Sequence, residues 1–277
     1  MDKILVTGAS GLVGSRFVEM YSDQYQFLTP DYIELDITNS ESAKKYLEDN
    51  KPDVVVNFAA FTNVSEAEKQ KRDKSGDCWK INVDGAKNLI GKHFLVHIST
   101  DMVFSGASGP YKETDIAETD PAKLTWYGFT KADAEREIGD KGTILRIIYP
   151  VRQKYDLKLD YLKKPLNLYE QGKLYPLFVD QQINIAFIDE ISNALEKIID
   201  NKLSGVYHVA SCDLTTPHEL ISYYISQKKG IDFSGQEGII DPTRYPKYGG
   251  LDVKLTQEKL GMKFSSWKEI VAKVLSF

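Results

Sequence analysis

The sequence predicts an α/β fold, with a doubly wound parallel sheet and a smaller α+β lobe. The first observation is a set of short apolar segments that are continuous rather than alternating, at residues 3–8, 53–60, 94–100 and 143–150. Such segments are typical of strands covered on both faces. The second observation is that segments with helical spacing separate them, which indicates the β-α-β order of a parallel sheet. The third is that this order stops after Pro150.

The remaining elements follow from local patterns. In the sheet region we expect helices at residues 11–21, 40–50, 81–91 and 128–139, and a second strand near residues 26–30. Beyond the sheet region we expect a helix at 186–200 with Asp189 as N-cap, a strand at 205–211, a helix at 216–230, a helix end at Gly261 and a last helix carrying Trp267, Ile270, Val271 and Val274.

Composition excludes several classes of function. Hydrophobic residues make up 42% of the 277 residues and charged residues 27%, as in an average globular protein. The net charge of −5 gives no reason to expect nucleic-acid binding. Cys78 and Cys212 have neither disulfide nor zinc-site spacing, and no segment approaches the ~18 apolar residues of a membrane span. We therefore expect a cytoplasmic protein without a metal site, a nucleic-acid partner or a membrane partner.

A glycine-rich loop follows the first strand. Gly8, Gly11 and Gly14 stand at the point where this strand leads into the first helix. Glycines there allow a tight turn and close approach of a pyrophosphate to the backbone, and the helix N-terminus attracts the anion. The pattern predicts a Rossmann-type dinucleotide-binding domain at residues 1–150, joined by 184–211. The smaller lobe, for substrate, comprises residues 151–183 and 212–277 with the C-terminal helix.

Tyr127 and Lys131 are four residues apart near the start of an expected helix, so both side chains can lie over one groove. A nearby ammonium favours phenolate and lowers the phenol pKa, which makes the phenol a usable general acid. The alternative is a surface lysine beside a half-buried tyrosine. The four histidines have no ligand spacing, and we expect them to be structural or exposed.

Several ordered motifs together resemble the extended short-chain dehydrogenase/reductase family. Besides the glycine loop they are "NFAAFTNVSEAE" from Asn57, "STDMVFSG" from Ser99 and "YGFTK" from Tyr127. Within that family the chain is most similar to the dTDP-4-dehydrorhamnose reductases. The resemblance covers residues 1 to about 150, then weakens, and returns in "VDQQ", in "GVYHVAS" with "TTPHEL", and near the C-terminus.

The resemblance implies roles for individual residues. Tyr127 would donate the proton, Lys131 would lower its pKa and bind the nicotinamide ribose, and Thr100 would hydrogen-bond the substrate carbonyl. Cofactor contacts are expected from Gly8, Ser10, Gly11, Leu12, Val13, Gly14, Asp36, Ile37, Ala59, Ala60, Thr62, Asn82, Ser99, Tyr127, Lys131 and Pro150. Substrate contacts are expected from Asp101, Met102, Val103, Phe104 and Gln182.

Some of these residues have a plain structural alternative. Asp36 could instead be an N-cap or a turn residue. Asn82 could be a solvated polar residue on a helix, and Pro150 could simply end a strand. The family places Ala59, Ala60 and Thr62 after the fourth strand.

The resemblance implies an NAD(P)H-dependent reductase for the 4-keto group of a nucleotide-linked deoxysugar, in dTDP-L-rhamnose biosynthesis. Met102 stands where related dehydratases carry a catalytic Glu, which disfavours dehydration. "DQQINIAF" lacks the Gly-x-Pro-Thr of these reductases, so the sugar and base stay open, as does NADH against NADPH. A sugar-nucleotide epimerase and a cofactor-binding regulatory subunit, like the beta subunit of methionine adenosyltransferase, are the alternatives. Relatives often form homodimers.

Overall fold

The computed structural model describes residues 1–241 and 246–276. They form two compact units. The first comprises residues 1–104, 116–146 and 192–207, and the second comprises residues 105–115, 147–191 and 208–277. The second unit thus includes residues 105–115, 147–150, 184–191 and 208–211, which the sequence assigns to the first. Within the described residues, no helix is long and apolar enough to cross a membrane.

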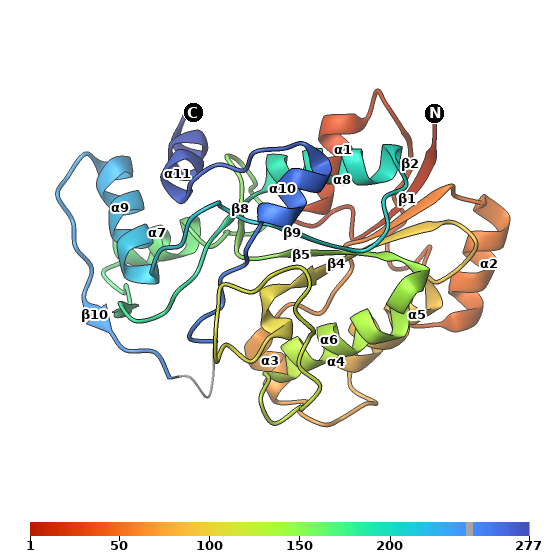
Figure 1. The fold of residues 1–277 in the computed structure, drawn as a ribbon, viewed down its shortest axis with the longest axis horizontal. Helices are drawn as coiled ribbons and strands as arrows, with labels where there is room; N and C mark the ends of the chain where they lie inside the picture. Colours follow the sequence, from red (N-terminus) through yellow and green to blue (C-terminus); the bar gives the residue numbers. More distant parts are fainter. Residues whose placement is uncertain (242–245, 277) are drawn as a thin grey trace. The chain divides into compact units, whose positions relative to one another are not determined.

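The central sheet has six strands in the order β2-β1-β3-β4-β5-β9 (Figure 1). Their bounds are β1 Lys3–Thr7, β2 Gln26–Leu28, β3 Val54–Asn57, β4 Phe94–Thr100, β5 Thr143–Ile147 and β9 Val206–Val209. The pairs β1·β2, β1·β3 and β3·β4 are parallel, and Thr7, Asn57 and His97 are register partners across β1, β3 and β4. All of β3 and β5 is buried, so the continuous apolar segments do form strands that are covered on both faces.

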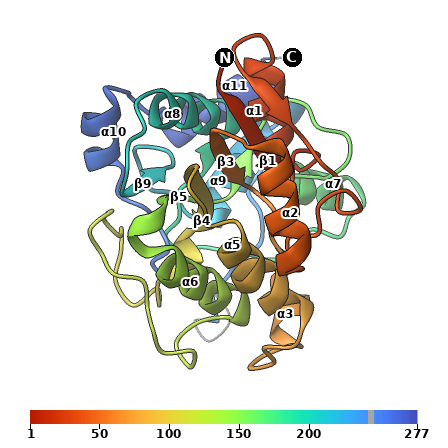
Figure 2. The ribbon, with the colours of Figure 1, turned by 90° about the vertical axis from the view of Figure 1, so that its right-hand side faces the viewer.

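Helices lie on both faces of this sheet (Figure 2). The first unit contains α1 Gly14–Tyr21, α2 Ser40–Asn50, α3 Val64–Glu68, α4 Asp77–Trp79, α5 Gly85–Asn88, α6 Trp126–Ile138, the π-helix η1 Lys80–Asp84 and the 3₁₀-helices η2 Asp101–Val103 and η3 Gly139–Lys141. Ala43 of α2, Ala86 of α5 and Ile138 of α6 pack in one core cluster with Val55 and Leu95 of the sheet. On the other face, α1 and α8 (Ile188–Asp200) are joined by a hydrogen bond from Tyr21 to Asn193. The predicted α/β fold with a parallel sheet is confirmed.

The second unit combines short strand pairs with helices. The pairs are β6 (Pro150–Val151) with β8 (Ala186–Phe187), and β7 (Leu177–Phe178) with β10 (Glu237–Gly238). Its helices are α7 Lys163–Glu170, α9 Pro217–Lys229, α10 Lys254–Leu260 and α11 Trp267–Leu275. Gly261 follows α10 with a φ of 59°, so the predicted helix end is confirmed. Asp189 lies inside the first turn of α8 and is not its N-cap.

Candidate active site

The glycine-rich loop lies at the edge of the sheet where β1 and β3 end. Gly8 directly follows β1 and has a φ of 68°, which favours glycine. A Cβ atom on Gly8 would lie 2.9 Å from the backbone nitrogen of Ala59, just after β3. The Gly11 amide donates to the Gly8 carbonyl at 2.9 Å, and α1 begins at Gly14. The loop is therefore a tight turn that delivers the positive end of a helix dipole to this edge.

Local capping places Tyr127 and Lys131 on α6. The Thr125 side chain accepts a hydrogen bond from the Gly128 amide and so caps the helix. Gly128 allows α6 to approach η2 closely, because a Cβ atom there would lie 2.1 Å from the Met102 carbonyl oxygen. Trp126 stacks on Trp79 of α4, with ring centroids 5.8 Å apart. The predicted helix is confirmed, and its start is held against the carboxyl end of β4.

Thr100 ends β4 and leads into η2. Its hydroxyl donates to Asp101 Oδ1 at 2.9 Å and accepts from the Met102 amide at 3.2 Å. Asp101 is buried, and desolvation raises the pKa of its carboxyl group to about 7 although the Thr100 hydrogen bond lowers it. A pair consisting of a hydroxyl and a carboxyl group that titrates near neutrality is suited to moving a proton.

The half-buried Tyr127 phenol does not behave as its spacing from Lys131 predicts. Burial raises its pKa well above the ordinary value, Asp101 and Cys78 raise it further, and only a hydrogen bond with Thr100 lowers it. Lys131 is not among the groups that shift this pKa in the described structure, so its effect on the phenol stays a prediction. The reason is geometric, because the Lys131 amine is bound elsewhere.

Lys131 is almost fully buried. Its Nζ atom lies 2.6 Å from the Ile98 carbonyl oxygen and 2.8 Å from Nε2 of His97. Desolvation lowers the pKa of the amine to about 7, whereas Glu135 and Cys78 raise it. The surface-lysine alternative is wrong, since a buried amine with a shifted pKa is typical of a functional site.

His97 is a functional candidate, although its sequence spacing predicts a structural or exposed histidine. It lies on β4, is buried, and contacts both Lys131 and Asn57, with 3.0 Å between its Nδ1 and Asn57 Nδ2. Burial lowers its pKa well below the usual value, and Lys131 lowers it further. The available signal was a polar residue inside an apolar strand three residues before Thr100.

Asn82 is buried in the π-helix η1 and is not solvated, so the alternative for this residue is wrong. Its side chain accepts from the Phe61 amide at 2.8 Å and donates to the Thr130 hydroxyl at 2.9 Å. Single π-turns often occur at functional sites. Asn82 thereby joins α6 to the loop that contains Ala59, Ala60 and Thr62. This loop follows β3, the third strand of the chain, and not the fourth strand as predicted.

The other predicted cofactor residues differ in their surroundings. Ser99 is buried, and its hydroxyl has no hydrogen-bond partner among the described residues. The exposed Asp36 carboxylate accepts from the amide and hydroxyl of Thr38, so it forms a turn, while Asn39 caps α2. Ile37 lies in the core cluster. Pro150 begins β6 in the second unit, so it is not the end of β5.

The predicted substrate residues do not form one set. Val103 and Phe104 are fully buried, and the Arg146 guanidinium lies 4.8 Å from the Phe104 ring centroid. This burial disfavours direct contact of either side chain with a substrate. Met102 is partly exposed beside Asp101. Gln182 is exposed in the second unit and forms a β-bridge with Tyr248.

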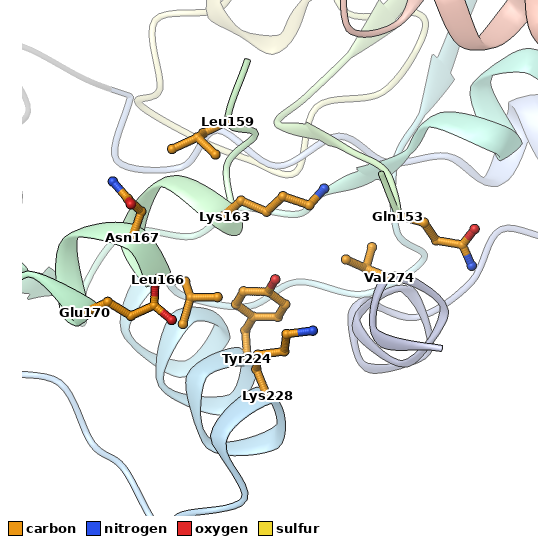
Figure 3. A pocket seen from close by; sticks show the side chains of 9 residues that line it. All are labelled: Gln153, Leu159, Lys163, Leu166, Asn167, Glu170, Tyr224, Lys228 and Val274. Atoms are coloured by element: carbon orange, nitrogen blue, oxygen red, sulfur yellow. The ribbon is translucent and has the colours of Figure 1, made fainter. Parts of the chain in front are cut away.

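A hollow of about 290 Å³ lies within the second unit (Figure 3). Lys163 and Leu166 of α7, Tyr224 and Lys228 of α9, and Val274 of α11 contribute to its lining. It contains none of the residues predicted for the site, and Lys163 is already bound to Asp160 at 2.7 Å. The hollow therefore adds nothing to the candidate active site.

Solved structures of known proteins share this fold. A dTDP-4-dehydrorhamnose reductase ortholog from Clostridium acetobutylicum is 28% identical, with a TM-score of 0.84 over 98% of this chain and 97% of its own. A dTDP-4-dehydrorhamnose reductase from Bacillus anthracis, solved in complex with NADP, has a TM-score of 0.86 at 24% identity, over 99% and 98% of the two chains. At 24% identity, the similarity to the Bacillus anthracis structure shows only that the two proteins share a fold.

Sequence comparisons extend over the whole chain. A dTDP-4-dehydrorhamnose reductase of Aggregatibacter actinomycetemcomitans is 27% identical, over 100% of this chain and 99% of that protein. Methionine adenosyltransferase 2 subunit beta of Pongo abelii is 25% identical, over 79% of this chain and 70% of that protein. The family model described as RmlD substrate binding domain matches residues 1–276. The chain therefore belongs to the RmlD substrate binding domain family.

Proposed function

We propose that this protein is a reductase that uses NADH or NADPH to reduce the 4-keto group of a nucleotide-linked deoxysugar, as its dTDP-4-dehydrorhamnose reductase relatives are named to do. The observation that carries the proposal is that Thr100, at the end of β4, is hydrogen-bonded to Tyr127 of α6, while Lys131 of α6 is bound to the Ile98 carbonyl of β4. Their hydroxyl, phenol and amine groups are those that carbonyl reduction requires.

The residues present fit a nicotinamide dinucleotide. The loop from Gly8 to Gly14 offers backbone amides and a helix N-terminus to a pyrophosphate, and the space at Gly8 is too small for a Cβ atom. The Ser99 hydroxyl, which has no hydrogen-bond partner among the described residues, offers a further buried hydrogen bond. The dinucleotide supplies the hydride, and Lys131 is the amine that would bind its ribose.

Tyr127 is suited to donate the proton. Because its pKa is raised, the phenol keeps its proton at neutral pH. A protonated phenol can therefore deliver a proton to the alkoxide that forms as the carbonyl carbon accepts hydride. The hydrogen bond with Thr100 lowers this pKa and so partly offsets the effect of burial.

Asp101 decides where the Thr100 hydroxyl hydrogen points. When Asp101 is ionised, this hydrogen is directed to Oδ1 at 2.9 Å. When Asp101 is protonated, its own O–H can donate to Thr100, which leaves the threonine hydrogen available for a carbonyl oxygen. Since the pKa of Asp101 is raised to about 7, both forms are populated at neutral pH.

The test is turnover by wild type and Tyr127→Phe with a dTDP-4-keto-deoxysugar, followed by the absorbance of NADH and NADPH. We expect wild type to consume reduced cofactor and Tyr127→Phe to lose about a hundredfold or more in rate, while binding cofactor normally. Tyr175→Phe, at a side chain that is 47% exposed, is the matched control. An epimerase would show no net loss of reduced cofactor. Cofactor binding without turnover by wild type would contradict the proposal and favour a regulatory role.

A further inference from the structure

The hollow of the second unit is lined by polar groups whose bonding capacity the fold leaves unused. It has a volume of about 290 Å³, and its walls come from α7, α9, α11 and the segment after β6. The central group is the hydroxyl of Tyr224 on α9, a residue that is only 2% exposed. This hydroxyl points into the hollow between Lys163 and Val274 (Figure 3), and it has no hydrogen-bond partner among the described residues. Buried residues seldom leave a polar group unpaired, so the hydroxyl calls for a partner that enters the hollow.

The Tyr224 phenol offers a proton to such a partner and carries no charge. Desolvation, together with the carboxylates of Asp160 and Glu170, raises its pKa to about 12. Each of these carboxylates has a cation of its own. Asp160 is balanced by Lys163, at 2.7 Å, and Glu170 is balanced by Lys229. The phenol therefore stays protonated at neutral pH and can donate a hydrogen bond into the hollow.

Two lysines at the hollow also have donors to spare. Lys163 Nζ donates to Asp160 Oδ2 and to the Arg152 carbonyl, which leaves one of its three protons without a partner among the described residues. Lys228 is exposed and forms no ion pair within the described part of the chain. Since the other charged side chains of the lining are paired, the positive charge of Lys228 is left uncompensated. The hollow therefore attracts an anion.

The rest of the lining suits an apolar body and a hydroxyl group. Leu166 and Val274 supply aliphatic contacts. The Gln153 amide donates its NH₂ protons to the Lys273 carbonyl at 2.9 Å and to the Ser276 hydroxyl at 3.1 Å, so its Oε1 atom is left as an acceptor. A water molecule takes up about 30 Å³ of liquid, so the hollow has room for roughly ten non-hydrogen atoms.

We propose that the hollow of the second unit is a binding site for a small monocarboxylic acid that carries a hydroxyl group. The carboxylate of this acid accepts hydrogen bonds from Lys228, Lys163 and the Tyr224 phenol. Its apolar body packs against Leu166, and its hydroxyl donates to Gln153 Oε1. Because the hollow shares no residue with the candidate active site, the acid is a second ligand and not the substrate of the proposed reduction.

The charges around the hollow favour one negative charge on the ligand over two. A phosphate monoester carries about −1.5 to −2 charges at neutral pH, which is more than the single uncompensated lysine can balance. Asp160 and Glu170 both act on the Tyr224 phenol, so their negative charges are felt at the hollow. They would repel the second charge of a phosphate, whereas a carboxylate has only one.

Titration of the full-length protein with 4-hydroxyphenylacetate, followed by calorimetry, tests the proposal. We expect saturable binding at one site. The neutral isostere 4-hydroxyphenylacetamide should bind about tenfold or more weakly, and phenylacetate, which lacks the hydroxyl, about fivefold more weakly. Absence of saturable binding, or equal binding of the amide, would overturn the proposal. Tighter binding of glucose 1-phosphate than of glucuronate would overturn the assignment to a monoanion.

Two substitutions locate the bound acid. Tyr224→Phe removes a hydroxyl that has no partner among the described residues, so urea unfolding of the free protein should be unchanged while the Kd of the acid rises about fivefold. Lys228→Gln should raise the Kd about tenfold. The matched controls are Tyr223→Phe, whose ring stacks on Trp267, and Lys173→Gln, at an exposed lysine outside the hollow. Both controls should bind like wild type.

Wild-type affinity in both Tyr224→Phe and Lys228→Gln would show that the acid binds elsewhere, which would overturn the proposal. A large loss of stability in Tyr224→Phe would also count against it, because the hydroxyl would then have a partner in the free protein. All of these measurements are made without a nucleotide sugar or a nicotinamide cofactor. A failure of the proposed reduction therefore leaves them intact, and a failure of acid binding leaves the proposed reduction standing.

Discussion

Replacement of Lys131 by Met should stabilise the fold near pH 7 while abolishing turnover. Lys131 is 2% exposed, and the pKa of its amine is lowered from 10.5 to about 7, mainly by desolvation. Between these two values the unfolded chain binds more protons than the folded chain. The stability of the wild type must therefore rise with pH across this window.

The size of this effect follows from the two pKa values. At pH 7 the unfolded lysine is fully charged and the folded lysine is half charged, which destabilises the fold by about 4 kcal/mol. At pH 10 the same linkage leaves about 1 kcal/mol. Methionine loses the hydrogen bonds to Ile98 and His97, but that loss does not depend on pH in this range. The stability difference between variant and wild type should thus change by about 3 kcal/mol from pH 7 to pH 10.

Urea unfolding of both proteins at pH 7, 8, 9 and 10 measures this difference. Lys92→Met is the control, because Lys92 is exposed and its surroundings change little on unfolding. Its stability difference from wild type should be the same at every pH. A Lys131→Met difference that is equally constant would show that Lys131 titrates as an ordinary lysine, and would refute the reasoning.

Two further predictions concern α6. Gly128→Ala places a Cβ atom 2.1 Å from the Met102 carbonyl oxygen. It should therefore destabilise the fold by about 1–3 kcal/mol and lower kcat by about a hundredfold. An unchanged kcat would contradict the close approach of α6 to η2. Glu135→Gln breaks the buried pair with Arg146 and should destabilise the fold by about 3–5 kcal/mol in urea unfolding, whereas Glu137→Gln, in a more exposed pair, should change it by less than about 1 kcal/mol. Equal effects of the two Glu substitutions would refute the importance of burial.

Local sequence patterns were sufficient for the sheet and for the reactive residues. The apolar segment at residues 94–100 forms β4 with the same bounds, and residues 40–50 form α2. Glycine spacing located the loop after β1, and the Tyr127–Lys131 spacing located the start of α6. These features depend on neighbours within a few residues along the chain, so propensity and periodicity can predict them.

The surroundings of those residues were decided by the tertiary structure alone. His97 is recognised only when β3 pairs with β4 in a register that sets Asn57 beside it, 40 residues away in the chain. Asn82 became a buried link only through its contact with Thr130 of α6. The pKa of Tyr127 is raised, although its spacing from Lys131 predicts a lowered value, because burial outweighs proximity in the sequence. Local sequence therefore specifies which groups are present and on which elements they lie. The packing of distant strands and helices sets their partners and charge, because desolvation and hydrogen bonding depend on contacts in space.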